Sequence, residues 1–221
     1  MNVQLTEEPD RFVWKRSTTG IFSVKTMYED FMNGLPRFPW KYLWKLKIPL
    51  KIKIFMWFLH KKVLLTKDNL AKRKWKGNMK CCFCDSEETI EHLFLLCPFA
   101  KMIWRIVHIS FALPPPISVT NMFGHWLDGI DKRTRAKIRT GISALCWSIW
   151  MCRNNLVFNH TRSFNFLQVI HMVAHWIQLW AFLQPADQQE HLVTGCNRLL
   201  TVASDFSNLG GWRHSSRLDF S

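Results

Sequence analysis

Apolar side chains recur along most of the chain at the three- and four-residue spacing that gives a helix one hydrophobic face. This spacing predicts helices over residues 40–44, 50–64, 67–75, 99–108, 120–127, 132–158 and 163–182. The last two have long apolar faces and a short connection, so we expect them to pack as an antiparallel hairpin. The chain is therefore predicted to be mostly α-helical.

The amino-terminal part follows a different pattern. Phe12 and Trp14 alternate with polar neighbours, residues 17–20 are typical of a turn, and the apolar pattern resumes at Ile21. Such alternation on both sides of a turn predicts a β-hairpin over residues 10–24. We expect this hairpin to precede the helices as the one β element of the fold.

Three consecutive prolines at positions 114–116 mark the clearest internal boundary. They separate a first domain, predicted for residues 10–112, from a helical region over residues 118–184. Residues 185–221 are more polar and end in GGWRHSSRLDFS, which predicts a disordered tail.

The formal charge is +14 and the isoelectric point is about 9.8, which indicates an anionic partner such as RNA or single-stranded DNA. Residues 41–80 hold 13 Lys or Arg side chains against a single acid, Asp68. A solvated helix face is the plainer explanation of a basic run, but this run is unusually one-sided. The side chains expected to contact phosphates are Lys51, Lys53, Lys61, Lys62, Lys72, Arg73, Lys74 and Lys76.

Aromatic residues are interleaved with this basic run. They are Trp40, Tyr42, Trp44, Trp57 and Trp75. Aromatic rings beside Lys and Arg can stack on unpaired bases. Most of these rings fall at helical spacing with Ile and Leu, however, so we expect the majority to lie in the core.

A cysteine-rich segment follows the basic run directly. Cys81, Cys84, His92 and Cys97 are spaced C-x2-C-x7-H-x4-C. Three thiolates and one imidazole are a common tetrahedral set for structural Zn²⁺, and a filled coordination shell leaves no open position for catalysis. Cys82 could replace Cys81 as the partner of Cys84, and free cysteines are also common as small buried apolar residues.

The spacing of the last two candidate ligands limits their geometry. Residues five apart on an ideal α-helix point about 140° away from each other, so His92 and Cys97 cannot reach one ion from an unbroken helix. Pro98 disfavours helical geometry at the residue before it. We therefore expect His92 on a short helix that begins near residue 88, with Cys97 just past its end.

The first residues, MNVQLTEEPDRF, lack the basic and apolar regions of a signal peptide, and no apolar run reaches the length of a bilayer span. We therefore expect an intracellular protein with no membrane partner and no small-molecule substrate. Its seven cysteines are then expected to be reduced, which favours metal over disulfides. The basic cluster at residues 73–76 slightly favours the nucleus.

Three stretches together resemble a known family. They are DRFVWKRSTTGIFSVKTMY, WKYLWKLKIPLKIKIFMWFLHKKVLLTKDNLAKR and CCFCDSEETIEHLFLLCPFAKMIW. In this order they are similar to the reverse transcriptase zinc-binding domain near the carboxyl end of plant LINE-type (non-LTR) retrotransposon polyproteins. A later stretch, ISALCWSIWMCRNNLVFN, is similar to the helical region that often follows it. The resemblance implies that Cys81, Cys84, His92 and Cys97 are the zinc ligands.

The resemblance further implies a non-catalytic accessory module associated with nucleic acid. The sequence contains no Asp-Asp pair of the kind a polymerase uses, so we expect no enzyme activity. One alternative is a scaffold role, in which Trp-rich helices over residues 118–182 dock on a polymerase domain. Another is a degenerate fragment of a retroelement with no independent function, since the chain begins just before the module and stops before any ribonuclease-like strand pattern.

Overall fold

The computed structural model describes residues 13–14, 19–21, 23, 26, 40–158 and 165–208. The chain divides into two compact units, Met1–Pro39 and Trp40–Ser221. Most of the β-hairpin predicted for residues 10–24 lies outside the described residues. Within the described part, the Trp14 N–H donates to the Gly20 carbonyl at 2.8 Å, but no strand is present. The structure therefore does not support the predicted hairpin.

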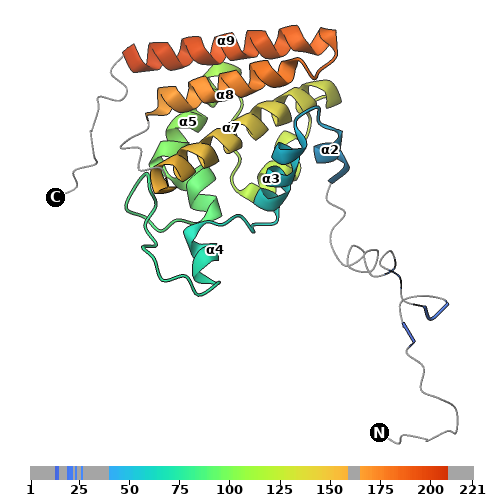
Figure 1. The fold of residues 1–221 in the computed structure, drawn as a ribbon. Coiled ribbons are helices and arrows are strands. Elements are labelled where there is room, and N and C mark those ends of the chain that lie inside the picture. The colour runs from blue at the N-terminus through green and yellow to red at the C-terminus, as the bar shows by residue number, and fades with distance from the viewer. Residues whose placement is uncertain are drawn as a thin grey trace, which may run out of the picture. The chain divides into compact units, whose positions relative to one another are not determined.

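The second unit is built from helices, as the sequence predicts (Figure 1). They are α2 (Trp40–Lys45), α3 (Leu50–His60), α4 (Lys67–Ala71), the π-helical turn η1 (His92–Leu96), α5 (Pro98–Phe111), α6 (Val119–Phe123), the 3₁₀ turn η2 (His125–Leu127), α7 (Lys132–Phe158), α8 (Phe166–Ala181) and α9 (Ala186–Asn208). Among the described helices, none combines the length and apolar character needed to cross a membrane.

Helices α7, α8 and α9 lie side by side in one layer, with α3 and α5 beneath it (Figure 1). Cys152 in the second half of α7 contacts Met172 in the first half of α8, with the two sulfur atoms 3.7 Å apart, while Gly141 in the first half of α7 faces Ile177 in the second half of α8. These two helices therefore form the antiparallel hairpin that their apolar faces predict. Helices α8 and α9 are also antiparallel, because the Phe166 and Phe206 rings meet with centroids 6.0 Å apart.

The prediction of a disordered tail over residues 185–221 is wrong for the helix α9. Its buried residues are Leu192, Cys196, Leu199 and Ala203. They recur at helical spacing and form a narrow apolar stripe between polar positions. The low overall hydrophobicity of this segment conceals the stripe, and α9 becomes stable by packing it against α8 and α5.

The proline run at 114–116 does not divide the hydrophobic core. Helix α5 precedes the prolines, yet it packs against α8 and α9, which follow them. The Arg105 guanidinium lies over the Phe206 ring at 5.7 Å, and the indole Nε1–H of Trp126 donates to the Pro114 carbonyl at 2.9 Å. Among the described residues, the segments before and after the prolines therefore share one continuous hydrophobic core, and the proline run connects them.

Two helices in the basic run end earlier than their apolar spacing predicts. Helix α3 ends at His60, and Lys62 adopts a left-handed conformation with φ of 57°. The Asn69 side chain donates to the carbonyls of Lys62 and Leu64, each at 2.8 Å, and so stabilises the turn between α3 and α4. Helix α4 ends at Ala71, and residues 72–80 form a loop that leads to the cysteines.

Candidate metal centre

A short turn positions the first two candidate ligands. Residues Lys80 and Glu87 form an antiparallel bridge, and the Cys81 N–H donates to the Ser86 carbonyl at 2.7 Å. Inside this turn the Phe83 N–H donates to Cys81 Sγ at 3.4 Å. The turn therefore folds the C-x2-C segment back on itself, which directs Cys81 and Cys84 toward one point.

The other two candidate ligands come from the turn η1. The Cys97 N–H donates to the His92 carbonyl at 2.7 Å, which is the i→i+5 bond of a π-helix. This wider turn brings the two residues closer together around the axis than an α-helix would. Cys97 itself has extended geometry, with ψ of 136°, so the prediction that it lies just past the helix end is confirmed.

The start of this helix differs slightly from the sequence-based prediction. Helical geometry begins at Ile90, two residues later than expected. Phe94 and Leu95 are buried, whereas Leu96 is 52% exposed. The indole Nε1–H of Trp104 donates to the Phe94 carbonyl at 2.8 Å, so a buried helix-end acceptor has a partner.

These two turns bring all four predicted ligands together. The ligand atoms of Cys81, Cys84, His92 and Cys97 all lie within 4.8 Å of one another. Cys84 Sγ is 3.1 Å from His92 Nε2 and 3.8 Å from Cys97 Sγ. A tetrahedral ion with Zn–S bonds of about 2.3 Å places its sulfur ligands about 3.8 Å apart. The donor set and the spacing therefore fit Zn²⁺.

The burial of the four side chains is uneven. Cys81 and Cys97 are buried, while Cys84 and His92 are half-buried. Hydrogen bonds from the Cys82 and Cys97 thiols lower the pKa of Cys81, and the same contacts raise the pKa of Cys82 and of Cys97. A bound cation would deprotonate all three sulfur ligands.

Cys82 belongs to a different group of side chains. It lies within 4.8 Å of Cys81 and Glu88, but it is not part of the four-residue cluster. The Glu88 carboxylate is already engaged by an arginine and by a backbone N–H, described below. Of the two pairings that the sequence left open, the structure supports Cys81 with Cys84.

Comparison with known proteins agrees with this geometry. Residues 22–104 match the family described as zinc-binding in reverse transcriptase, and the match includes all four clustered side chains. The resemblance seen in the sequence is therefore confirmed over residues 22–104, which are similar to the reverse transcriptase zinc-binding family.

A curated relative extends the comparison to a plant protein. The chain is 31% identical over 111 residues to a putative ribonuclease H protein of Arabidopsis thaliana. The alignment covers 47% of this chain and 18% of the relative, so the chain spans less than a fifth of that protein. No solved structure matches this chain.

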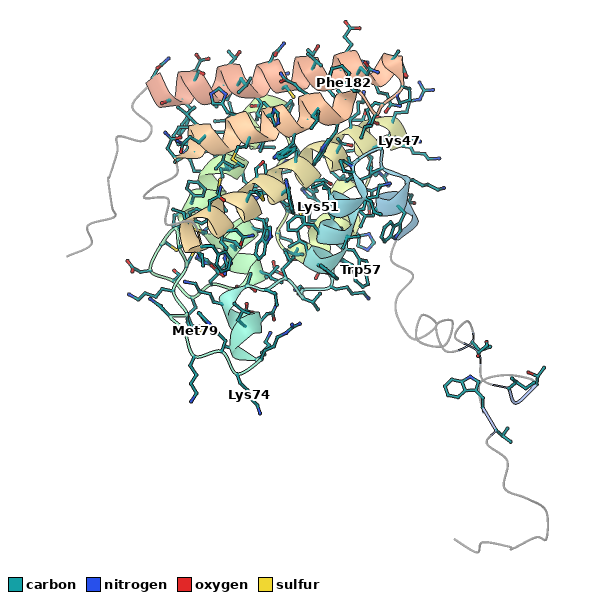
Figure 2. All side chains as sticks on the ribbon, in the orientation of Figure 1. Lys47, Lys51, Trp57, Lys74, Met79 and Phe182 are labelled. Carbon is teal, nitrogen blue, oxygen red and sulfur yellow. The ribbon has the colours of Figure 1, made fainter. Side chains whose placement is uncertain are left out.

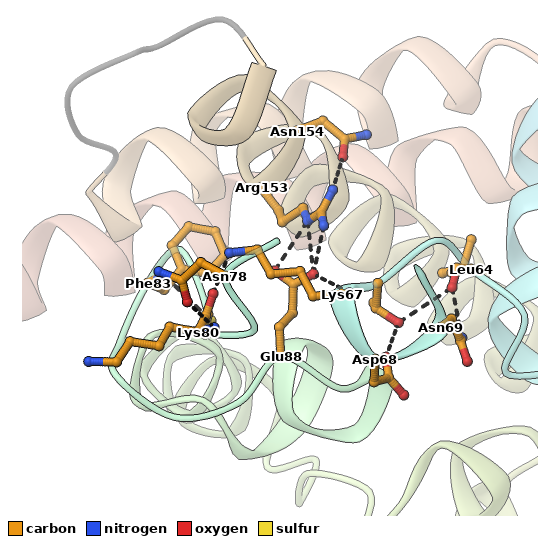
Figure 3. A network of polar contacts seen from close by, with 12 residues as sticks. Leu64, Lys67, Asp68, Asn69, Asn78, Lys80, Phe83, Glu88, Arg153 and Asn154 are labelled. Atoms are coloured by element: carbon orange, nitrogen blue, oxygen red, sulfur yellow. Dashed lines mark hydrogen bonds and ion pairs between the residues drawn. The ribbon is translucent and has the colours of Figure 1, made fainter. Parts of the chain in front are cut away.

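A buried ion pair anchors the zinc-binding domain to a helix beyond the family match (Figure 3). Arg153 on α7 places Nη2 2.7 Å and Nε 3.2 Å from Glu88 Oε1. The Lys67 N–H at the start of α4 donates to the same oxygen at 3.0 Å. The side chains of Glu88 and Arg153 are 0% and 2% exposed, so both charges are withdrawn from water.

Sequence reasoning missed this pair, although one signal was present. Ile142, Leu145 and Ile149 form a buried stripe along α7 at helical spacing, and Arg153 occupies the next position of that stripe. A charged residue on a buried helix face requires a buried partner. The identity of that partner, 65 residues away in the chain, is visible only in the structure.

A second acid of the zinc-binding domain makes a similar link. Glu91 Oε2 accepts from the Val119 N–H at 2.8 Å, which ties the segment to the start of α6. Its other oxygen lies 2.7 Å from Lys62 Nζ. Glu88 and Glu91 therefore attach the metal-binding segment to α4, α6, α7 and the end of α3.

The eight predicted phosphate-contacting side chains fall into two groups. Five make contacts within the protein. Lys51 lies over the Trp147 ring at 5.1 Å, and Lys53 donates to the Trp44 carbonyl at 3.0 Å. Lys62 pairs with Glu91, Lys72 pairs with Asp68, and Lys61, which follows the end of α3, is half-buried. Arg73, Lys74 and Lys76 are exposed, and their side chains have no ion pair or hydrogen bond with any described residue. Figure 2 shows Lys74 at the edge of the second unit, away from Lys51.

The expectation that most aromatic rings of the basic run lie in the core is wrong. Trp57 is half-buried, but Tyr42, Trp44 and Trp75 are exposed. Helix α2 is short and turns Leu43 inward, which leaves its neighbouring rings on the outer face. Trp75 lies beyond the end of α4, so helical spacing does not apply to it.

Proposed function

We propose that this chain is a non-catalytic accessory module that binds RNA or single-stranded DNA through a basic loop, residues 72–80, which a structural zinc ion holds in place. The observation that carries the proposal is the position of Arg73, Lys74 and Lys76. These cations lie directly before the ligand segment and have no ionic partner among the described residues. Cations left available at a surface attract phosphates by releasing condensed counterions.

The base of the basic loop is closed by the metal-binding segment. At the beginning of the loop, α4 is fixed because the Lys67 N–H donates to Glu88. At its end, Lys80 pairs with Glu87 in the bridge, and the Lys67 ammonium group donates to the Lys80 carbonyl. When bound, zinc would add a cross-link between residues 81 and 97 and so keep this base rigid.

The donor set supports a structural and not a catalytic role for the ion. Three sulfurs and one imidazole complete a tetrahedron and leave no position for a water nucleophile. The Arabidopsis relative is a much longer protein, and the alignment covers 18% of it. We therefore propose that this module supports a catalytic partner and has no turnover of its own.

The test is fluorescence anisotropy with a labelled single-stranded oligonucleotide over a range of salt concentrations. The zinc-loaded wild type should bind with an affinity that falls steeply as salt rises. The triple variant R73Q/K74Q/K76Q should bind more weakly, with a log–log slope smaller by about 2, since each phosphate contact on a single strand contributes about 0.7. The control K51Q/K53Q, in which both lysines already contact protein groups, should change the slope less. Absence of binding at low salt would refute the proposal and favour a fragment without this function.

A second candidate function is docking on a protein, such as an upstream polymerase domain. The end of α8 and the turn after it expose three large apolar side chains: Leu179, Phe182 and Leu183. Figure 2 shows Phe182 among them. Exposed apolar groups in a cluster mark protein contacts more often than isolated ones do. Self-association that light scattering detects, and that F182S/L183S abolishes, would favour this function. A monodisperse wild type would count against it.

A further inference from the structure

The basic loop contains one exposed aromatic ring whose position is fixed. Trp75 is 41% exposed, and its backbone N–H donates to the Leu70 carbonyl at 3.2 Å. The preceding residue, Lys74, is left-handed with φ of 67°, which turns the chain sharply after α4. The loop therefore presents the ring at its surface through a defined backbone conformation.

A glycine lies directly against this ring. A Cβ atom at Gly77 would lie 1.8 Å from Trp75 Cζ2 and 2.1 Å from Cη2, so any larger residue would displace the indole. The Gly77 backbone thus supports one side of the ring, while the remaining surface faces solvent. A supported ring loses little conformational freedom when a second planar group stacks on it.

The surroundings of the ring are cationic and otherwise polar. Residues 72–78 are all exposed, and Trp75 is the only large apolar side chain among them. The nearby acids Asp68 and Asp85 are paired with Lys72 and Lys80 at 3.7 and 3.2 Å. Their charges are therefore compensated, and the positive charge of Arg73, Lys74 and Lys76 acts on the space around the indole.

We propose that Trp75 is a stacking site for an unpaired base, with Arg73, Lys74 and Lys76 binding the adjacent phosphates. A single ring among cations offers too little apolar area for a protein interface. An unpaired nucleotide matches both features, because it has a flat aromatic base and a phosphate within reach of the same loop. Bases inside a duplex keep their faces covered, so the site selects single strands.

This inference rests on the proposed function, and the test separates the two. The zinc-loaded full chain is titrated with a labelled oligothymidylate and, separately, with the same strand paired to its complement. Trp75→Ala should weaken single-strand binding by about 5- to 160-fold, the range of base–aromatic stacking, and should change duplex binding less than about twofold. Trp75→Phe should restore most of the loss because it keeps a ring.

The matched control is Trp44→Ala, since Trp44 is 45% exposed on α2 and lies in the same basic run. This variant should bind like the wild type. Equal affinity of Trp75→Ala and wild type for the single strand, or an equal loss in Trp44→Ala, would overturn the inference. If the wild type binds neither probe, the proposed function itself fails.

Photo-crosslinking provides a readout that does not depend on the folding of a variant. The wild type is irradiated with bound oligothymidylate, and the attached peptide is identified by mass spectrometry. Attachment within residues 72–79 supports the site, and attachment confined to other segments overturns it.

Zinc content equal to that of the wild type shows that the Trp75 variants keep the neighbouring metal centre.

Discussion

The Arg153 guanidinium and the Glu88 carboxylate form a buried ion pair, with Nη2 and Oε1 2.7 Å apart. Glu88 lies between Cys84 and His92 in the metal-binding segment, whereas Arg153 lies 65 residues later on α7. The family match ends at residue 104, so this contact joins the zinc-binding domain to a helix outside it. The conformation of the metal-binding segment therefore depends on α7 as well as on its own sequence.

Removing one member of this pair should destabilise the protein strongly. Arg153→Met leaves the Glu88 carboxylate buried without a counter-charge, which costs roughly 3–5 kcal/mol. The double variant E88Q/R153M should lose less than the sum of the single variants, because it buries no unpaired charge. The free energy of unfolding in urea, measured with saturating zinc, tests both statements.

The exposed pair Lys80–Asp85 is the control for this prediction. Its side chains are 60% and 66% exposed, and such pairs contribute between about 0 and 1 kcal/mol. Asp85→Asn should therefore have a small effect. If Arg153→Met cost no more than Asp85→Asn, the buried pair would not be a structural anchor.

Substitution of the clustered and the spare cysteines should have opposite effects on metal content. Cys97→Ser removes a ligand atom that lies 3.8 Å from Cys84 Sγ, so the purified variant should lose its zinc and the local fold around residues 81–97. Cys82 lies outside the four-residue cluster, so the Cys82→Ser variant should keep its zinc. Atomic absorption and circular dichroism measure the two properties.

Cys146→Ser controls for the burial of a cysteine. Cys146 is fully buried on α7 and belongs to neither of the clusters found among the described residues. Its substitution should lower stability without loss of metal. Zinc retained by Cys97→Ser, or lost by Cys82→Ser, would contradict the ligand assignment.

Helix α9 should contribute to stability through its apolar stripe. Leu199 is 2% exposed, and Leu199→Ala should cost about 2–5 kcal/mol because it leaves a cavity beside α8 and α5. Val193 on the same helix is 39% exposed, so Val193→Ala should stay within about 0.5 kcal/mol. Thermal unfolding of both variants tests this. If α9 were only loosely attached, Leu199→Ala and Val193→Ala would lower stability by the same amount.

A histidine at the end of α3 should make stability depend on pH. Burial, with added repulsion from Lys61 and Lys62, lowers the pKa of His60 from 6.5 to about 4. The unfolded chain therefore binds this proton more readily, and the free energy of unfolding should fall as pH decreases from about 6.5 to about 4.

His60→Gln removes this proton-binding group and isolates its contribution. Acid release of zinc affects both proteins, so the informative quantity is the difference in unfolding free energy between wild type and variant. As pH falls from about 6.5 to about 4, the unfolding free energy of the wild type should fall relative to that of His60→Gln. A constant difference over that interval would show that His60 titrates normally in the folded protein.

The long helices illustrate what a local pattern can predict. Helix α7 spans Lys132–Phe158, the range expected from its apolar spacing, because a long periodic segment averages over individual exceptions. Short or weakly apolar segments were predicted less well. The stripe of α9 was overlooked. Helix α3 ends early at the turn that left-handed Lys62 and the Asn69 side chain form, and α4 ends shortly before left-handed Lys74.

The sequence by itself determined the candidate metal ligands, Cys84, His92 and Cys97 with either Cys81 or Cys82, since ligand chemistry and spacing within 17 residues are local properties. It also determined the excess of positive charge between residues 41 and 80. Only the tertiary structure decided that Arg153 neutralises Glu88, that Cys82 stays outside the cluster, and that Arg73, Lys74 and Lys76 remain available for a ligand. The physical reason is that burial and charge pairing depend on contacts between segments far apart in the chain, which spacing along the sequence does not encode.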